Sequence, residues 1–147
     1  MDVLITGSTG MVGKSALYEC IKDDRINKIY LINRSESGIK NPKISELVIK
    51  DFLLVKNLKS KIKNCDACFH CMGITSFGHN KKYYYEVTYE MTKLITDLIY
   101  EINPSAVMTY VSGEGTNAKE NSKITWVNVK GKAENYILNR GLKDSYM

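Results

Sequence analysis

The chain has 147 residues, 44% of them apolar and 25% charged, with a formal net charge of +5, which suits one ordinary globular domain. No segment reaches the roughly 20 apolar residues of a membrane helix, and the start lacks the basic stretch and apolar run of a signal peptide. The lysines are scattered, which favours a solvated surface over a nucleic-acid-binding face, so we expect a cytoplasmic protein without nucleic-acid or membrane partners.

Strand-like and helix-like patterns alternate along the whole chain. Strands are predicted at residues 2–6, 28–32, 46–50, 66–72, 106–111 and 145–147, and helices at 11–22, 53–62, 81–102 and 124–138. This alternation predicts a parallel sheet covered on both faces, and right-handed crossovers make it doubly wound. The expected fold is therefore an α/β Rossmann fold in three α/β/α layers, one domain over residues 1–147. Its strand order is 3-2-1-4-5-6, with a partial sixth strand.

Two of the predicted helices carry clear apolar faces. In the first helix the face comprises Met11, Val12, Ala16, Leu17, Cys20 and Ile21. In the long helix the stripe comprises Val87, Met91, Leu94, Ile95, Leu98, Ile99 and Ile102. Such stripes are expected to face the sheet or a partner.

A glycine-rich turn, Gly7-Ser8-Thr9-Gly10-Met11-Val12-Gly13, joins the first strand to the first helix. At this junction the pattern predicts a dinucleotide site. Gly7 allows a tight turn, Gly10 lets the backbone approach a diphosphate, and Gly13 lets the helix pack closely. The helix N-terminus offers free N–H groups to the phosphates. A nucleoside-triphosphate loop is the rival interpretation, but that motif needs a glycine at Ser8; a turn without ligand is the structural alternative.

The end of the second strand bears on the choice of dinucleotide. NAD sites usually place an acidic residue there to bind the ribose 2′-hydroxyl, whereas this chain has Arg34. An arginine can form charge-assisted bonds with a 2′-phosphate. The sequence therefore favours NADP(H), with NAD(H) as the alternative, or else Arg34 is an ordinary surface residue.

Three of the four cysteines, Cys65, Cys68 and Cys71, have a spacing that also occurs in metal sites. They fall in or beside a predicted buried strand, where Cys68 and Cys71 would point to opposite faces. We therefore expect free thiols and no metal site.

Later segments complete a recognisable pattern: Asp51-Phe52 after the third strand, Cys71-Met72-Gly73 after the fourth, Ser112 after the fifth, and Lys130 on the last helix. With the glycine-rich turn, the chain resembles the atypical short-chain dehydrogenase/reductases, close to the NAD-dependent epimerase/dehydratase group. The resemblance implies that residues 7–13, Arg34, Asp51, Phe52, Cys71, Met72, Gly73 and Lys130 bind the cofactor. It also implies that Ser112 holds a substrate carbonyl.

The resemblance breaks at one catalytic position. The family has a proton-transferring tyrosine four residues before the lysine, and this chain has Trp126 there. An indole offers only an N–H donor. Glu114 is the candidate substitute acid, with His79 and the cluster at Tyr83, Tyr84 and Tyr85 as alternatives, while His70 is expected to be a core histidine.

Two functions stay open from the sequence. One is hydride transfer between NADP(H) and a small carbonyl or alcohol, with Ser112, Lys130 and Glu114 as the catalytic set. The other is a regulatory or scaffold protein that binds the dinucleotide without turnover. The chain ends before the family's substrate-binding part, so we expect a shortened chain and an unknown small-molecule substrate. The long helix would permit a homodimer.

Overall fold

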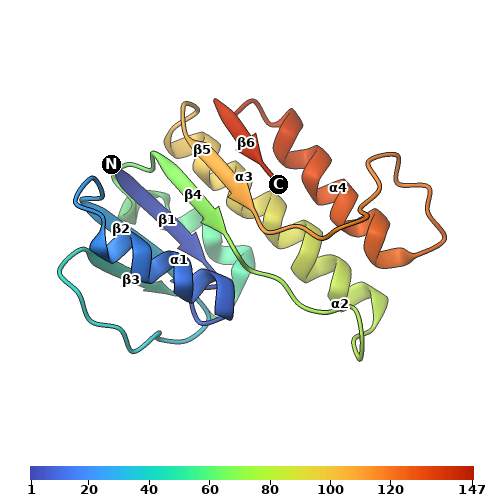
Figure 1. Cartoon of the computed structure of the whole chain (residues 1–147), viewed down its shortest axis with the longest axis horizontal. Coiled ribbons are helices and arrows are strands. Elements are labelled where there is room, and N and C mark those ends of the chain that lie inside the picture. Colours follow the sequence, from blue (N-terminus) through green and yellow to red (C-terminus); the bar gives the residue numbers. More distant parts are fainter.

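The structure, a computed structural model, describes residues 1–147 and is organised around one six-stranded parallel sheet (Figure 1). The strands are β1 (Asp2–Thr6), β2 (Lys28–Asn33), β3 (Ile44–Val48), β4 (Ala67–His70), β5 (Val107–Tyr110) and β6 (Asp144–Tyr146). Their order across the sheet is β3-β2-β1-β4-β5-β6, and every neighbouring pair is parallel. The predicted fold class and strand order are confirmed, including the short sixth strand.

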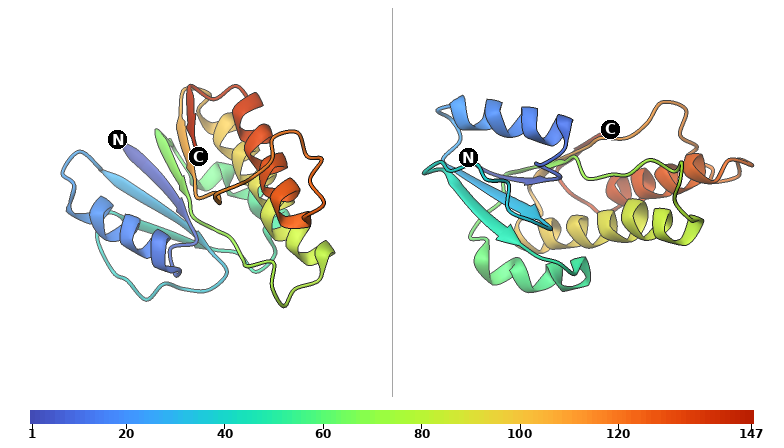
Figure 2. Two further views of the ribbon diagram at one scale, coloured as in Figure 1. Left: turned by 45° about the vertical axis from the view of Figure 1, so that its right-hand side comes forward. Right: turned by 90° about the horizontal axis from the view of Figure 1, so that it is seen from below.

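Helices lie on both faces of this sheet, but unevenly. They are α1 (Met11–Lys22), the 3₁₀ helix η1 (Phe52–Lys61), α2 (Lys81–Tyr85), the π-helical segment η2 (Glu86–Glu90), α3 (Met91–Ile102) and α4 (Thr125–Asn139). Only α1 covers one face, whereas η1, α3 and α4 lie on the other (Figure 2). Because strand residues alternate between faces, Leu4 and Ile32 enter the larger core under η1, α3 and α4, and Ile5 and Leu31 enter the smaller core under α1.

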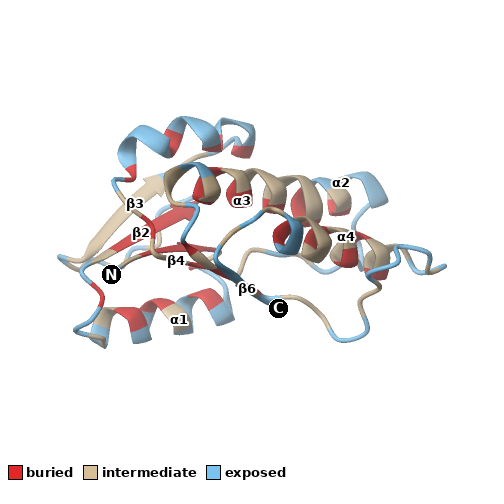
Figure 3. Cartoon of the chain, turned by 90° about the horizontal axis from the view of Figure 1, so that it is seen from above, coloured by how far each residue is buried: buried red, intermediate tan, exposed pale blue.

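The apolar face predicted for α1 is wrong at its first turn. Met11 is 85% exposed and Val12 46% exposed, whereas Leu17 and Cys20 are buried (Figure 3). The helix starts at the carboxyl edge of the sheet, and only its later turns lie over the strands. The apolar side chains of the first turn therefore face the solvent beside the glycine-rich turn.

The helix predicted at 53–62 is a 3₁₀ helix that begins and ends one residue earlier, at Phe52–Lys61. Its buried residues, Phe52, Val55 and Leu58, repeat every third position. A 3₁₀ helix has about three residues per turn, so this spacing keeps all three side chains against the core.

The predicted long helix is continuous but contains the π-helical segment η2. Four buried side chains in it, Tyr84, Thr88, Thr92 and Thr96, recur every fourth residue. This repeat exceeds the about 3.6 residues of an α-helical turn, and the wider π turn at Glu86–Glu90 fits the spacing from Tyr84 to Thr92.

Other boundaries shift by a few residues. The strand predicted at 46–50 begins at Ile44, directly after a turn in which Ile44 N–H donates to Asn41 O at 3.0 Å. The strands predicted at 66–72 and 106–111 are shorter, because their last residues leave the sheet to form loops.

The apolar stripe of the long helix is largely used inside this chain. Ile95, Leu98 and Ile99 belong to the larger core, and α3 packs against η1. Because these side chains are buried within the chain, the stripe does not support the predicted homodimer, which stays a prediction. None of the helices combines the length and the apolar run that crossing a bilayer requires.

Candidate functional site

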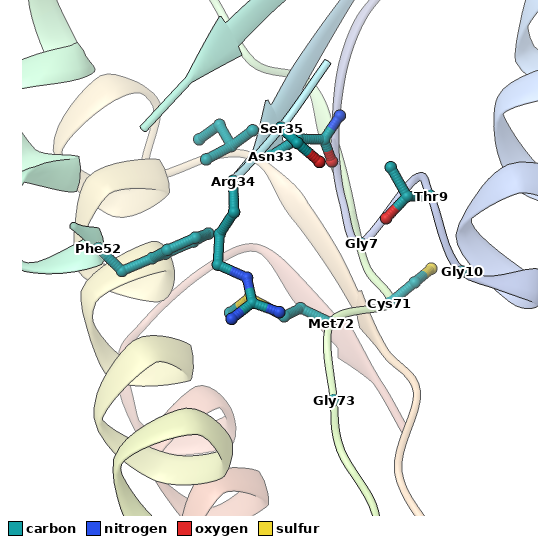
Figure 4. Close-up of a pocket in the computed structure, with 11 residues that line it drawn as sticks. Gly7, Thr9, Gly10, Asn33, Arg34, Ser35, Phe52, Cys71, Met72 and Gly73 are labelled. Atoms are coloured by element: carbon teal, nitrogen blue, oxygen red, sulfur yellow. The ribbon is translucent and has the colours of Figure 1, made fainter. Parts of the chain in front are cut away.

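A cavity of about 200 Å³ opens at the carboxyl ends of β1, β2 and β4 (Figure 4). The chain reverses its winding direction between β1 and β4, and such switch points are where open parallel sheets bind ligands. Eight of the predicted cofactor residues line the cavity: Gly7, Thr9, Gly10, Arg34, Phe52, Cys71, Met72 and Gly73. The same cavity is also lined by Ile32, Asn33 and Ser35.

Glycine is required at two positions of the turn. Gly7 has φ of +69°, and a Cβ there would lie 2.8 Å from backbone atoms of Cys71 and Met72. A Cβ on Gly13 would lie 2.3 Å from Gly7 O. The turn is thus pressed between the start of α1 and the end of β4.

Gly10 differs from these two glycines, because it borders open space. It is the N-cap of α1, has φ of −82°, and a Cβ there would be 3.4 Å from its nearest atom, Gly7 O. No side chain caps this helix and its first turn holds no acidic residue. Its backbone N–H groups and the positive end of its dipole therefore face the cavity side unneutralised.

A buried polar network supports the turn from the neighbouring strand. Ser8 donates to Asn33 Oδ1 at 3.0 Å, and Asn33 Nδ2 donates to Glu46 Oε1 at 2.7 Å. Glu46 also accepts from Ser37 N–H at 2.8 Å. The sequence reasoning missed Glu46, which pairs with Leu31 across β2 and β3 and so brings a carboxylate to the end of β2.

Arg34 leaves the end of β2 and extends across the cavity mouth. Figure 4 shows its guanidinium running past Phe52 toward Met72. Arg34 is exposed and makes no hydrogen bond or ion pair within the chain. Its charge is therefore available to an anion in the cavity.

Six other predicted cofactor residues do not line this cavity, and one of them, Lys130, lies one strand away on α4. Ser8 is buried behind the turn, and Met11, Val12 and Gly13 form the first turn of α1. Asp51 caps η1 by accepting from Leu53 N–H at 2.9 Å, so its carboxylate has a structural role.

His70 is fully buried at the end of β4 and links three elements. Thr92 Oγ1 donates to Thr88 O at 2.7 Å, which uses its only proton. Nε2 of His70 must therefore carry the hydrogen and donate to Thr92 Oγ1 at 2.9 Å, while Nδ1 accepts from Thr6 Oγ1 at 2.7 Å. Burial, with a smaller contribution from the charge of Lys130, lowers the pKa of His70 to about 3. The predicted core histidine is confirmed, and it fixes the strand residue that precedes Gly7.

A second group of predicted residues gathers one strand away, after β5. Lys130 Nζ donates to Val111 O at 3.2 Å and lies 5.2 Å from the centre of the Tyr110 ring. A Cβ on Gly113 would be 3.4 Å from Lys130 Cδ and 3.6 Å from Trp126 Cζ3. The loop that carries Ser112 therefore packs against Trp126 and Lys130. Burial lowers the pKa of Lys130, against an opposing effect of Glu134.

The carboxylate that meets Ser112 is Glu134, which sequence reasoning did not select. Ser112 Oγ donates to Glu134 Oε1, and Thr116 Oγ1 donates to Glu134 Oε2 at 2.9 Å. Residues 126, 130 and 134 are successive four-residue steps on α4, so helical periodicity was the available signal. Glu114 is exposed and makes no hydrogen bond. It borders an open groove that Ser112, Thr116 and Glu134 also line.

None of the alternative proton donors is hydrogen-bonded to Ser112, although His79 and Tyr84 line a pocket with Trp126. Tyr85 hydroxyl accepts from Lys132 Nζ at 2.7 Å, and the Tyr83 ring packs 5.4 Å from that of His79. Tyr84 is buried beside Trp126, where burial raises its pKa, and it makes no hydrogen bond to Ser112.

The cysteines take different positions. Cys65 and Cys68 are buried in the larger core, whereas Cys71 is half-buried at the cavity. All four thiols are unbridged, and burial is the main cause that raises the pKa of each one.

Comparison with known proteins decides the family. Residues 3–133 match the NAD dependent epimerase/dehydratase family. The chain belongs to this family. It is also 27% identical over 143 residues to "Protein FMP52, mitochondrial" of Meyerozyma guilliermondii, covering 94% of this chain and 59% of that protein.

Solved structures share the fold of this family member. A short-chain dehydrogenase/reductase superfamily protein of Agrobacterium tumefaciens with bound NAD has a TM-score of 0.75 at 16% identity, covering 99% of this chain and 47% of that one. The putative carbonyl reductase Sniffer of Caenorhabditis elegans has a TM-score of 0.77 at 15% identity, covering 97% and 79%. The chain thus spans little more than half the length of the curated relative and under half that of the bacterial structure.

Proposed function

We propose that this family member binds NADP(H) in the cavity at the glycine-rich turn and transfers hydride between it and a small carbonyl or alcohol substrate. The observation that carries the proposal is the cavity itself, which combines the uncapped start of α1 with the unpaired guanidinium of Arg34. The bound NAD of the Agrobacterium tumefaciens protein, a member of the same superfamily, supports a dinucleotide as ligand.

The residues present fit such a cofactor. Gly10 has no Cβ and borders open space, so a diphosphate has room next to the backbone N–H groups of α1. Phe52 and Met72 offer apolar walls on the side of Arg34, where an adenine would lie. Arg34 would bind the 2′-phosphate of NADP(H). The negative charge of Glu46 opposes this, but its Oε1 already accepts from Asn33 and Ser37 N–H, and its Oε2 from the Ser37 hydroxyl.

The residues after β5 would serve the chemistry. When bound, the nicotinamide ring supplies or accepts a hydride. Lys130, held by Val111 O at the edge of the sheet, would orient the nicotinamide ribose. Ser112 would hold the substrate oxygen through its hydroxyl. Glu114, which borders the groove without a partner, stays a weaker candidate for proton transfer.

Arg34→Ala tests the cofactor assignment. Loss of a charge-assisted hydrogen bond costs about 1.5–3 kcal/mol, so the Kd for NADPH should rise about tenfold or more. The Kd for NADH should change less than about twofold, because NADH has no 2′-phosphate. Calorimetric titration of both cofactors measures this. Arg25→Ala is the matched control, since Arg25 lies before the opposite end of β2 and its guanidinium pairs only with Asp23. Equal losses for both cofactors would contradict the 2′-phosphate assignment.

A second candidate is dinucleotide binding without turnover, in a regulatory or scaffold protein. Trp126 favours it, because an indole cannot transfer the proton that the family's tyrosine transfers. This candidate predicts NADPH binding without NADPH oxidation over a panel of aldehydes, ketones and quinones.

We also propose a cytoplasmic location and the single domain of residues 1–147 as the binding unit. The curated relative carries the word mitochondrial in its name, so fractionation of cells that express the full natural protein is the direct test of location. Recovery of the protein with mitochondria would contradict the cytoplasmic proposal.

A further inference from the structure

The family position for a proton-transferring tyrosine holds Trp126, yet the hydroxyl of Ser112 already has a titratable partner in this chain. Ser112 Oγ donates to Glu134 Oε1, and Thr116 Oγ1 holds Oε2 at 2.9 Å. Both oxygens of this carboxylate are therefore oriented by hydroxyl groups. An ion pair with Lys130 is absent, although the lysine is four residues earlier on the same helix.

Glu134 also reaches the solvent. It borders a groove of about 520 Å³ together with Ser112, Thr116 and Glu114, and the groove is open to the surface. A proton that arrives on Glu134 from Ser112 can thus pass to water in this groove. Trp126 and Lys130 pack against Gly113 of the same loop and do not line this groove.

We propose that Glu134 replaces the absent tyrosine as the proton store of the reaction, acting through Ser112 as a relay. This inference rests on the proposed hydride transfer. In the oxidative direction the substrate O–H proton moves to Ser112 Oγ as the Ser112 hydroxyl proton moves to Glu134 Oε1. The C=O bond forms as the C–H electron pair leaves as hydride to the oxidised dinucleotide. Glu134 then releases its proton to water in the groove. The reductive direction runs the same transfers backward, so atoms and charges balance.

Glu134 is a positioning residue, because it acts on the substrate through Ser112. A proton relay and a purely structural contact predict different dependences of turnover on pH. A relay makes turnover depend on the protonation state of Glu134, whereas a structural contact does not. Glu134→Gln preserves the shape of the side chain but cannot take up a proton.

The test compares wild type, Glu134→Gln, Ser112→Ala and the double variant, with NADPH oxidation by benzaldehyde, cyclohexanone and phenanthrenequinone followed across pH. Acid–base groups contribute about 10²–10⁴-fold, so each single variant should lose about 100-fold or more in kcat. The double variant should lose no more than either single one, because both belong to one relay. The pH dependence of kcat assigned to Glu134 should disappear in Glu134→Gln.

Cofactor affinity gives a readout that does not depend on activity. Glu134 does not line the cavity at the glycine-rich turn, so calorimetry should give a Kd for NADPH within about twofold of wild type in Glu134→Gln. Glu101→Gln, which changes an exposed carboxylate near the C-terminal end of α3, is the matched control for the substitution itself.

Three outcomes overturn the relay. They are multiplicative losses in the double variant, an unchanged pH profile in Glu134→Gln, or a loss that follows Glu114→Gln instead. If Glu134→Gln does not fold, the Ser112→Ala variant is decisive: an unaltered pH profile and activity in that variant would also overturn the relay. Wild type that binds NADPH but turns over none of the substrates also overturns it, and leaves the dinucleotide site standing. Absence of NADPH binding instead contradicts the proposed function.

Discussion

Acidification from about pH 7 to about pH 5 should cost this protein about 2 kcal/mol of folding free energy through one side chain, His70. The imidazole is fully buried between Thr6 and Thr92, and burial lowers its pKa from 6.5 to about 3. Above pH 6.5 it is neutral in both folded and unfolded chains, so it contributes no pH dependence. As pH falls below 6.5 the unfolded chain binds a proton that the native chain refuses, and stability drops until pH reaches about 3.

Urea denaturation at the two pH values, followed by the fluorescence of Trp126 and by circular dichroism, measures the difference. Carboxylates such as Asp66, whose pKa the backbone N–H of Asp2 holds below its usual 3.8, lose their contribution at lower pH and interfere little in this window. His70→Asn should abolish most of the pH difference, and His79→Asn, which removes the exposed second imidazole, should retain it.

Two results would refute this account of His70. One is a wild-type difference below about 0.5 kcal/mol, and the other is a His70→Asn variant that keeps the full difference. If the variant does not fold, the imidazole resonances of wild type give the answer directly, because those of His70 should not titrate between about pH 7 and pH 5.

Two glycines give further predictions about stability. Gly13→Ala places a Cβ 2.3 Å from Gly7 O, so backbone must move at the cost of about 1–3 kcal/mol, and NADPH binding should weaken with it. Gly131→Ala places a Cβ 2.2 Å from Asn117 O, and should destabilise the protein despite the better helix propensity of alanine. Gly73→Ala is the control, because no atom lies within 4 Å of the added Cβ. Its free energy of unfolding should be within about 0.5 kcal/mol of the wild-type value. Urea midpoints check all three, and equal midpoints for Gly13→Ala and Gly73→Ala would contradict the packing argument.

Much of the fold follows from patterns that are local in the sequence. Strand and helix periods alternate clearly enough to predict the sheet order, and Gly7 and Gly13 occupy a junction where only glycine fits. The three-residue spacing of Phe52, Val55 and Leu58 matches the 3₁₀ helix η1. The apolar run alone does not distinguish a 3₁₀ helix from an α-helix, so the sequence predicted only a helix there.

The parts that sequence reasoning missed depend on contacts between distant segments. Glu46 reaches Asn33 at the end of β2 only because β3 pairs with β2 in one particular register, and a shift of one residue would turn it to the other face. Glu134 meets Ser112 only once α4 packs beside the loop after β5. Met11 and Val12 followed the apolar pattern of α1 but lie past the edge of the sheet, which a helical period does not reveal.

The most direct test of the dinucleotide site is a calorimetric titration of Gly10→Asp with NADPH, beside wild type and Gly10→Ala. Gly10 is an N-cap with φ of −82° and room for a Cβ, and aspartate is a favourable N-cap, so the variant should be at least as stable as wild type. Its carboxylate would stand where the diphosphate binds and repel it. We predict saturable binding to wild type and none to Gly10→Asp at comparable concentrations; unchanged NADPH affinity in a folded Gly10→Asp would contradict the assignment of this turn to the cofactor.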